Sequence, residues 1–253
     1  MKLQDKIVLI TGAAGSIGSG VAAACLEEGA VLALADKNPA GLQSLAERLQ
    51  LDPVRHMLVT ADVADEAQVR AMVDAVTARY GRIDVFHNNA GTGGRKQTIA
   101  ELDLDAYRAW MDVNLFGFVT ALKYVLQVMY RQGSGSIINT SSQAAKKPAA
   151  GGVDYCLQKS AVVMMTKIAA LESNGKGVRV NCILPGYVDS DMMRKNFEVF
   201  PALEQSIQKN VPLNRMCSVE EIGRVVAFLG SDEASYITGA PIYIDGGWLS
   251  TQM

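Results

Sequence analysis

The stretch Ile7–Gly18 reads IVLITGAAGSIG and decides the fold class. Its first five residues are mostly aliphatic and predict a buried strand, and the glycines that follow predict a tight turn. A helical pattern then occupies residues 17–28. A strand that enters a helix through a glycine-rich turn opens a βαβ unit, and small residues in that turn let the backbone approach a pyrophosphate at the helix N-terminus.

The glycine spacing alone leaves two interpretations open. Gly12, Gly15 and Gly18 depart from the G-x-G-x-x-G pattern, and such a turn is as often a plain tight turn as a nucleotide site. The second predicted strand ends at Asp36, eighteen residues after Gly18, where a carboxylate can accept hydrogen bonds from the ribose hydroxyls of adenosine. A 2′-phosphate would meet Asp36 as a like charge, which the neighbouring Lys37 offsets only in part. The sequence therefore favours NAD over NADP as the cofactor.

Strand-like and helix-like segments alternate along the chain, which predicts an α/β fold: a single doubly wound (Rossmann-like) domain spanning residues 1–253, with a mostly parallel sheet and helices on both faces. The stretch 187–215, after Pro185-Gly186, is less regular and is interpreted as a substrate lid over the sheet edge where ligands bind in such folds. The predicted strands are Ile7–Thr11, Val31–Ala35, Val54–Ala61, Ile83–His87, Ser136–Thr140, Val178–Leu184 and Ile242–Asp245, and the predicted helices are 17–28, 39–50, 65–80, 105–131, 153–174 and 219–229.

Composition excludes several function classes. The net charge of −2 gives no electrostatic footprint for nucleic acid or an anionic membrane. No apolar run approaches the length of a transmembrane helix, and the N-terminus enters a strand directly, so we expect neither a membrane span nor a signal peptide. Four cysteines without a Cys-x-x-Cys pair indicate thiols in a reducing, cytoplasmic compartment. The chain has only two histidines, so it offers few ligands for a zinc site and few candidates for a Ser-His-Asp triad, and no metal is expected.

Eight short motifs, in order along nearly the whole chain, make the sequence resemble the short, single-domain branch of the short-chain dehydrogenase/reductase family. Each motif is weak alone, and their order within the strand–helix alternation carries the resemblance. It implies a seven-stranded doubly wound sheet, a bound dinucleotide and a homotetramer. The motifs are the glycine turn, Asp62-Val63, Asn88-Asn89-Ala90-Gly91, Asn114, Ser141-Ser142, Tyr155-x-x-x-Lys159, Pro185-Gly186 and Asp245-Gly246-Gly247.

The resemblance also implies roles for single positions. Asp62 and Val63 would hold the adenine ring, and the turn 88–91 would line the cofactor cleft and brace the central strands. Asn114 would kink its helix and hold a water that connects Lys159 to solvent. Ser16 and Ser190 stand where many relatives carry a glycine and a threonine. The residues expected to bind the cofactor are Gly12, Gly15, Ser16, Ile17, Gly18, Asp36, Asp62, Val63, Asn89, Ala90, Gly91, Tyr155, Lys159, Pro185, Gly186, Val188 and Ser190.

Tyr155 and Lys159 are four residues apart and therefore share one face of a helix. A phenol has an ordinary pKa near 10, and bringing it close to neutral pH requires about 4 kcal/mol of preferential stabilisation of the phenolate. The Lys159 ammonium and the positive nicotinamide ring are the two sources we expect. Ser142 precedes Tyr155 by thirteen residues and is placed to hydrogen-bond the substrate oxygen. The alternative is a surface Tyr–Lys pair on an amphipathic helix.

We therefore predict an oxidoreductase that transfers a hydride between NAD(H) and a secondary alcohol or ketone, with Asn114, Ser142, Tyr155 and Lys159 as its catalytic set and Tyr155 as the general acid/base. Two alternatives stay open. One is a 3-oxoacyl-thioester reductase of the same family, which Asp36 disfavours because its usual cofactor is NADPH. The other is a catalytically silent NAD-binding regulatory protein, which the complete catalytic set disfavours.

The substrate is not decided by the sequence. A basic cleft rim could steer an anionic substrate, or its charges are ordinary exposed ones. Soft apolar residues could equally cap a hydrophobic alcohol. The rim residues are Arg95, Lys96, Lys146, Lys147, Arg194, Lys195 and Arg215, and the apolar candidates are Met192, Met193, Phe197, Phe200 and Met216. His87 ends an apolar strand and is interpreted as a packed core histidine.

Overall fold

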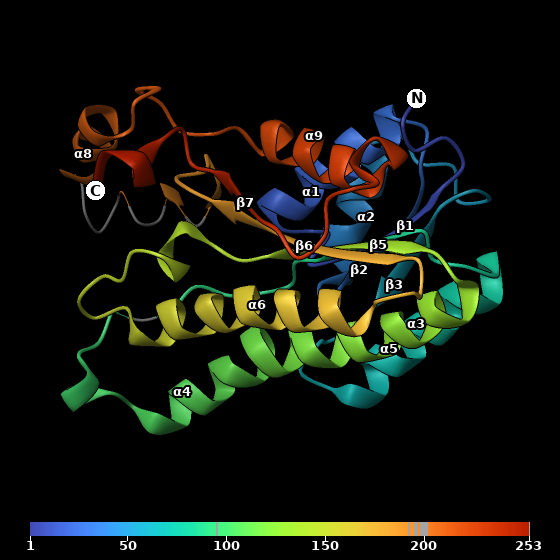
Figure 1. Cartoon of the computed structure of the whole chain (residues 1–253), viewed down its shortest axis with the longest axis horizontal. Helices are drawn as coiled ribbons and strands as arrows, with labels where there is room; N and C mark the ends of the chain where they lie inside the picture. Colours follow the sequence, from blue (N-terminus) through green and yellow to red (C-terminus); the bar gives the residue numbers. More distant parts are fainter. Residues whose placement is uncertain (95, 192, 195–196, 198–201, 253) are drawn as a thin grey trace.

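A computed structural model describes residues 1–94, 96–191, 193–194, 197 and 202–252. Its described strands form one parallel seven-stranded sheet in the order β3-β2-β1-β4-β5-β6-β7 (Figure 1). The order reverses between β1 and β4, and in open α/β sheets the ligand crevice lies at such a switch point. The strands are β1 (Ile7–Thr11), β2 (Val31–Asp36), β3 (Met57–Thr60), β4 (Val85–Asn88), β5 (Gly135–Thr140), β6 (Val178–Pro185) and β7 (Pro241–Ile244).

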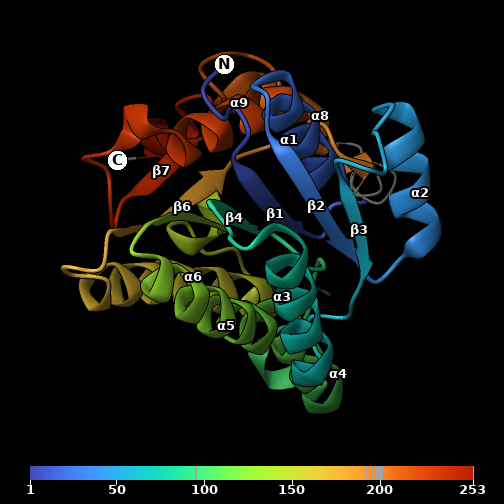
Figure 2. The same ribbon diagram turned by 90° about the vertical axis from the view of Figure 1, so that its right-hand side faces the viewer.

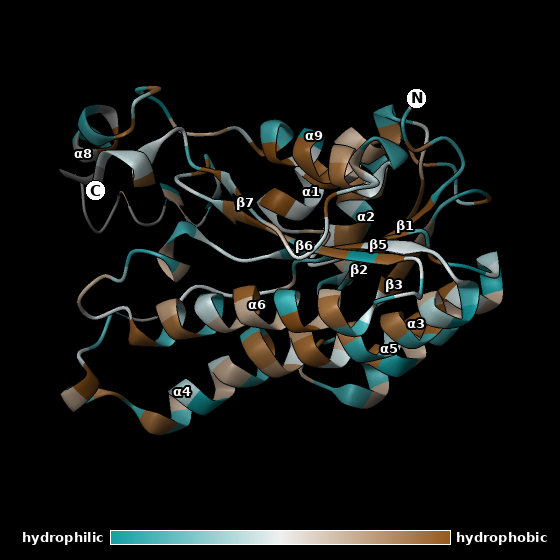
Figure 3. Ribbon diagram, viewed as in Figure 1, coloured by the Kyte–Doolittle hydropathy of each residue, from teal (hydrophilic) through white to brown (hydrophobic). Residues whose placement is uncertain are grey.

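Helices cover both faces of this sheet, as the sequence predicts for a doubly wound fold (Figure 2). One face carries α1 (Ser16–Glu27), α2 (Pro39–Arg48) and α9 (Val219–Gly230), and these helices share a buried apolar cluster with one side of the strands. The other face carries α3 (Glu66–Tyr80), α5 (Gly117–Gln132) and α6 (Val153–Glu172), which form a second cluster. Hydrophobic residues recur along the helices of both layers (Figure 3).

The central strands are buried on both faces, which explains their continuous apolar sequence. Along β1, Val8 and Ile10 belong to the cluster under α1, whereas Ile7 and Leu9 belong to the cluster under α3 and α5. This alternation follows from the two-residue period of a strand. The sheet is therefore a rigid layer whose carboxyl-end loops carry the site.

A π-helical turn interrupts the longest helical segment. The segment runs through α4 (Leu104–Met111), the π turn η2 (Asp112–Phe116) and α5. Asn114 lies inside this turn and is buried; the kink expected at Asn114 stays a prediction. By length and composition alone, Leu104–Gln132 could cross a membrane, and half of its most apolar window is buried within the domain. Core helices of globular domains show the same property.

Two expectations about secondary structure are wrong. The third strand begins at Met57, not at Val54, because Asp52 organises a turn there: its carboxylate accepts a hydrogen bond from the Val54 N–H, and its carbonyl accepts one from the His56 N–H. The stretch 187–215 is also more regular than predicted, since it contains the helix α8 (Ala202–Asn210). Few apolar residues mark α8 in the sequence, yet Ile207 is buried.

Candidate active site

A cavity of about 560 Å³ is lined by residues at the carboxyl ends of the strands and by the loops that follow them. It brings together nearly all the predicted site residues from seven separate segments. Only Gly18 and Asn114 of that set do not line it, and both lie directly behind its wall. The predicted residues that line it are Gly12, Gly15, Ser16, Ile17, Asp36, Asp62, Val63, Asn89, Ala90, Gly91, Ser142, Tyr155, Lys159, Pro185, Gly186, Val188 and Ser190.

The glycine turn after β1 has the close backbone packing expected of a phosphate cradle. Gly12 has φ +65°, and a Cβ there would lie 2.7 Å from the Ala90 Cα. A Cβ at Gly18 would lie 2.1 Å from the Gly12 carbonyl oxygen, so Gly18 shapes the turn from behind rather than lining the cavity. A Cβ at Gly15 would meet only an ordinary contact at 3.4 Å. The turn therefore requires glycine at its two ends.

Asp36 lies beside this turn at the end of β2. One carboxylate oxygen accepts a hydrogen bond from the Ala14 N–H at 3.1 Å, and the other accepts one from the Asn38 N–H at 3.0 Å. These bonds fix the carboxylate at the cavity wall, beyond the glycine turn. The residues present fit an adenosine ribose with free hydroxyls, and the negative charge disfavours a 2′-phosphate.

The turn after β4 braces the central strands as expected. The Asn88 side chain donates hydrogen bonds to the Phe118 carbonyl and to the Asn139 side chain, which links β4 to α5 and β5. The Asn89 side chain donates to the carbonyl oxygens of Thr11 and Gly12, and this contact joins the turn to the glycine turn. The cavity floor is therefore held by side-chain hydrogen bonds between three strands.

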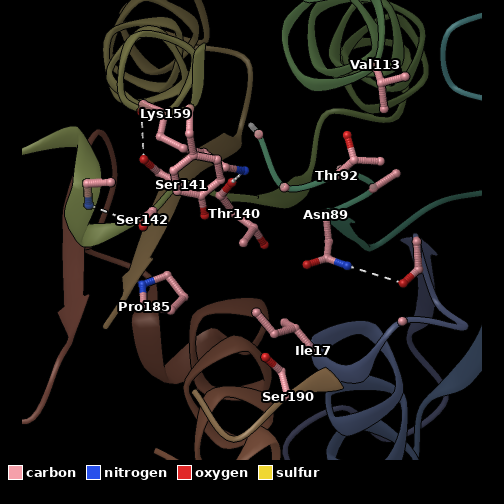
Figure 4. A pocket seen from close by; sticks show the side chains of 18 of the residues that line it. Ile17, Asn89, Thr92, Val113, Thr140, Ser141, Ser142, Lys159, Pro185 and Ser190 are labelled. Carbon is pink, nitrogen blue, oxygen red and sulfur yellow. Dashed lines mark hydrogen bonds between the residues drawn. The ribbon is translucent and has the colours of Figure 1, made fainter. Parts of the chain in front are cut away.

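The three central catalytic candidates line the same cavity, and Figure 4 shows Ser142 and Lys159 on one side of it. Ser142 follows β5 and hydrogen-bonds the Tyr155 hydroxyl. Lys159 is 5% exposed, its Nζ donates to the Thr140 carbonyl at 3.0 Å, and Nζ lies 5.8 Å from the centroid of the Tyr155 ring. A hydroxyl, a phenol and an amine thus face one space, which excludes the interpretation of Tyr155 and Lys159 as a surface pair.

Burial governs the charges of this group. It raises the pKa of the Tyr155 phenol, and the hydrogen bond from Ser142 lowers it in part. Burial also lowers the pKa of Lys159 to about 8. The sequence predicts that Lys159 lowers the pKa of Tyr155, and that role stays a prediction. The protein groups present here do not overcome the effect of burial on Tyr155, so more stabilisation of the phenolate is needed when the site is loaded.

Asn114 does not line the cavity itself but holds the Thr92 backbone, which forms part of the cavity wall. Its Oδ1 accepts a hydrogen bond from the Thr92 N–H at 2.7 Å, and its Nδ2 donates to the Thr92 carbonyl at 3.1 Å. A Cβ at Gly91 would lie 3.0 Å from Asn114 Oδ1 and 3.9 Å from Lys159 Nζ, so both polar groups approach the same point of the loop. The water that Asn114 is expected to hold stays a prediction.

The sequence placed Thr92 and Gln143 in the cleft wall, as the structure has them, but assigned neither side chain a role. Thr92 Oγ1 and Gln143 Oε1 are buried and, among the described residues, have no hydrogen-bond partner. Buried polar atoms in this state indicate places where a ligand supplies the partner. Gln143 directly follows Ser142, and Thr92 directly follows the Asn88–Gly91 motif, so their positions next to motifs were the available signal.

The two described arginines of the basic rim, Arg194 and Arg215, are each paired with a carboxylate. Arg194 pairs with Asp189 at 2.7 Å, and Arg215 makes two hydrogen bonds to the Glu221 carboxylate. The ammonium of Lys147 lies 4.5 Å from the centroid of the Trp248 ring. Of the rim residues, Lys96 lines the cavity, and so does the acidic Asp154. The rim and apolar candidates Arg95, Lys195, Met192 and Phe200 lie outside the described residues, whereas Met193 lines the cavity.

His87 is a core histidine, as predicted. It is fully buried, its Nε2 hydrogen-bonds Thr140 Oγ1 at 2.8 Å, and burial lowers its pKa to about 3. It is therefore neutral at physiological pH. Across the part of the chain that the structure describes, no three His, Cys, Asp or Glu side chains are grouped so that they could hold a metal ion.

Known proteins resemble this chain over almost its full length. The family model described as Enoyl-(Acyl carrier protein) reductase matches residues 12–249. The D-threitol dehydrogenase of Mycolicibacterium smegmatis is 38% identical over 98% of this chain and 94% of its own. The crystal structure of NAD⁺-bound xylitol dehydrogenase superposes with a TM-score of 0.93 at 32% identity, covering 98% of this chain and 100% of the other. A short-chain type dehydrogenase/reductase from Mycobacterium ulcerans gives a TM-score of 0.93 at 33% identity, covering 99% and 92%.

Proposed function

Because this chain belongs to the short-chain dehydrogenase/reductase family, we propose that it oxidises a neutral secondary alcohol with NAD⁺, using Tyr155 as the general base. It is an NAD-dependent oxidoreductase that interconverts a secondary alcohol and a ketone. The observation that carries the proposed mechanism is the meeting of Ser142, Tyr155 and Lys159 in the cavity that also contains the glycine turn and Asp36.

The reaction moves two electrons and two hydrogens. When bound, NAD⁺ would supply the acceptor for the hydride of the carbinol carbon and a positive ring, whose charge would favour a phenolate at Tyr155. The Tyr155 phenolate takes the hydroxyl proton as the carbon–oxygen double bond forms. The Ser142 hydroxyl, which already hydrogen-bonds Tyr155, orients the substrate oxygen. The alcohol and NAD⁺ therefore give the ketone, NADH and one proton.

Lys159 contributes charge and position. Its amine is buried near the Tyr155 ring and is mostly protonated at neutral pH, because its pKa is about 8. A nearby positive charge stabilises a phenolate relative to a phenol. The hydrogen bond to the Thr140 carbonyl fixes the amine toward the cavity rather than toward solvent.

A neutral substrate fits the charges of the cavity best. The paired arginines at the rim leave little positive field, and Asp154 is a buried carboxylate beside Tyr155. Two of the similar proteins are named for threitol and xylitol, which are uncharged polyols, and these two support a neutral alcohol. This supports the dehydrogenase over an enzyme that depends on an anionic substrate.

The thioester reductase remains the second candidate. The description of the matching family model, a reductase for acyl-carrier-protein substrates, supports it. Asp36 counts against it because that carboxylate is fixed beside the glycine turn and disfavours NADPH. The silent regulatory protein has no observation in its favour, since all four catalytic side chains are present and Ser142, Tyr155 and Lys159 face one cavity.

We further propose a cytoplasmic homotetramer. The outer faces of α5 and α6 expose apolar side chains that a second copy of this chain would cover, and the family resemblance supports that assembly. The exposed apolar side chains on these two helices include Val119, Leu157, Met164, Ile168 and Leu171. The free cysteines suit a reducing cytoplasm. Light scattering should give four times the mass of the chain, and a stable monomer would contradict the assembly.

The stretch 187–215 is proposed to be a lid over the substrate. Ser190 and Met193 line the cavity, and the Ser16 hydroxyl donates to Asp191 at 3.0 Å, which joins this stretch to the glycine turn. Such loops often gate turnover. Hydrogen exchange across 187–215 should slow when cofactor and substrate bind together, and unchanged exchange would exclude a lid.

The proposed function is tested by an NAD⁺-reduction screen over neutral secondary alcohols, polyols and hydroxy acids, followed by Tyr155→Phe. This substitution removes the hydroxyl and keeps the ring, so kcat should fall about 10²–10⁴-fold, the usual contribution of general acid/base catalysis. The Kd for NAD⁺, measured by calorimetry, should stay close to that of the wild type. A variant that keeps more than a tenth of the wild-type kcat would rule out Tyr155 as the base.

A further inference from the structure

We propose that the carboxylate of Asp191 competes with the pyrophosphate of NAD(H) for the hydroxyl of Ser16, so that this one side chain weakens cofactor binding and speeds the release of NADH. The inference rests on NAD(H) as the cofactor and goes beyond the alcohol chemistry proposed above. It involves no covalent step, because one hydrogen-bond acceptor replaces another at Ser16.

Two hydrogen bonds join Ser16 to Asp191, although 175 positions separate them in the chain. The Ser16 hydroxyl donates to Asp191 Oδ2 at 3.0 Å, and the Asp191 N–H donates to the Ser16 oxygen at 3.2 Å. A serine hydroxyl has a single hydrogen to donate. That hydrogen is given to Asp191 here, so a phosphate oxygen can accept it only after the Asp191 carboxylate has moved away.

Ser16 is the first residue of α1, where the phosphates of the cofactor are expected. It lines the cavity together with Gly15 and Ile17. The first turn of α1, residues 16–19, reads SIGS and carries no negative charge of its own. Negative charge is favoured at a helix N-terminus. Asp191 brings such a charge from the stretch 187–215, and a bound pyrophosphate would bring the same charge to the same helix end.

The glycine turn offers no cationic side chain that would mask the charge of Asp191, since residues 12–18 read GAAGSIG. Backbone N–H groups would therefore hold the pyrophosphate, and Asp191 would face it as a like charge bonded to the same hydroxyl. The Asp191 side chain is 78% exposed, so water and salt screen its charge. Its effect on the cofactor is therefore moderate: it weakens binding without preventing it.

Arg194 gives the displaced carboxylate a partner. Its guanidinium lies 3.5 Å from Asp191 Oδ1 and 2.7 Å from Asp189 Oδ1. The Ser190 carbonyl accepts a hydrogen bond from the Arg194 N–H at 2.9 Å, which keeps these side chains in one short turn. Asp191 can thus leave Ser16 and keep its ion pair. The exchange replaces one hydrogen bond of Ser16 by another, so a moderate charge repulsion is enough to shift it.

The experiment measures cofactor binding rather than turnover. Calorimetry compares the wild type with Asp191→Asn, which removes the charge and keeps an oxygen that can accept from Ser16. At about 10 mM salt, the Kd for NAD⁺ and for NADH should fall about threefold to fivefold, the size of one exposed charge interaction. At about 500 mM salt the difference should shrink, because exposed charges are screened there. The dissociation rate of NADH, measured by stopped-flow fluorescence, should slow by a similar factor.

Ligands with and without phosphates locate the effect. ADP-ribose carries the same pyrophosphate and should also bind Asp191→Asn about threefold to fivefold more tightly at low salt. Adenosine has no phosphate and should bind both proteins equally.

Two further variants assign the effect to the contact with Ser16. Asp189→Asn is the matched control, because it removes an equal charge that pairs with Arg194 in the same segment. It should change the Kd for NAD⁺ by less than about twofold. Ser16→Gly introduces the residue that many members of the family carry and removes the hydroxyl. Adding Asp191→Asn to Ser16→Gly should give less than half of the gain that it gives in the wild type, because the two side chains act through one contact.

The expected result is tighter binding, which a folding defect cannot imitate. Equal Kd values for NAD⁺ in the wild type and Asp191→Asn at low salt would overturn this inference while the proposed function stands. An equal gain with Asp189→Asn, with adenosine, or in the Ser16→Gly protein would also overturn it. A wild-type protein that binds neither NAD⁺ nor NADH would contradict the proposed function itself.

Discussion

Replacing Lys159 by Met tests the charge of the active site most directly. Methionine has a similar length and no charge, so it preserves the packing of a side chain that is 5% exposed and lies against the Phe118 and Tyr155 rings. What it removes is the ammonium and its hydrogen bond to the Thr140 carbonyl. The variant should therefore report on how much this charge stabilises the Tyr155 phenolate.

The structure sets the magnitude. With the Tyr155 ring centroid taken as the position of the negative charge, the separation from Lys159 Nζ is 5.8 Å. Two unit charges at that distance attract by about 3 kcal/mol at an effective dielectric constant of about 20. That energy corresponds to about a hundredfold in the phenolate population and therefore in the oxidation rate near neutral pH. The charge of Lys159 is lost above its pKa of about 8, so its benefit fades there.

The assay is the pH–rate profile of alcohol oxidation from pH 6 to pH 10 for the wild type, Lys159→Met and Lys2→Met, in which an exposed lysine outside the cavity is changed. The rate of Lys159→Met should be about a hundredfold lower at pH 7, should rise with pH, and should approach the wild type above pH 8. Lys2→Met should follow the wild type throughout. A constant ratio of the Lys159→Met rate to the wild-type rate across the range would refute the electrostatic role and leave only a positioning role.

Asp36→Ala should lower the NAD⁺-to-NADP⁺ ratio of kcat/KM by at least about tenfold, because the like charge facing a 2′-phosphate is removed; equal use of both cofactors by the wild type would contradict this. Gly18→Ala should lower the melting temperature and Gly15→Ala should not, since a Cβ at these positions would lie 2.1 Å and 3.4 Å from the Gly12 carbonyl oxygen; equal melting temperatures would show that the turn relaxes. The pKa of His87 is about 3 in the folded protein and near 6.5 when unfolded, so the stability that His87 contributes is present above pH 6.5 and is lost as the pH falls. Urea unfolding should show about 2 kcal/mol less stability at pH 5 than at pH 7, and less of this loss in His87→Leu.

The sequence predicted most of the fold because the strands carry two signals at once. β1 is apolar throughout and is followed by a glycine turn, and the structure places its bounds at Ile7–Thr11 as expected. Where a segment carried only one such sequence signal, its secondary structure was predicted wrongly. Val54 looked like part of a strand because it is β-branched, but the hydrogen bonds of Asp52 close a turn there. The helix α8 was missed because a short, mostly polar segment carries little apolar periodicity.

The site residues could be predicted where their types and spacing within one short motif already indicate the chemistry. Tyr155 and Lys159 meet because four residues span about one helical turn, and that spacing is visible in the sequence. The sequence placed Gln143 in the cleft wall but gave its side chain no role, because its surroundings include Tyr187, which lies more than forty residues away and comes near only through the pairing of β5 with β6. The direction of the pKa shift of Tyr155 could not be predicted from the sequence either, because burial in the folded protein causes it.

The π turn at Asp112–Phe116 has a consequence for how the chain tolerates insertions and deletions. A π turn holds one residue more than the α-helical turn it replaces, and one residue corresponds to about 100° of helix rotation. Because the wide turn absorbs its extra residue locally, deleting one residue from it would restore a regular α-helix with α4 and α5 in about the same register, and would move the side chains within the turn itself. Asn114 would then lose its alignment with the Thr92 backbone, to which it is bonded at 2.7 Å and 3.1 Å. The extra residue thus sets the direction in which the turn presents the Asn114 amide, and the number of residues in Asp112–Phe116 is constrained by that contact.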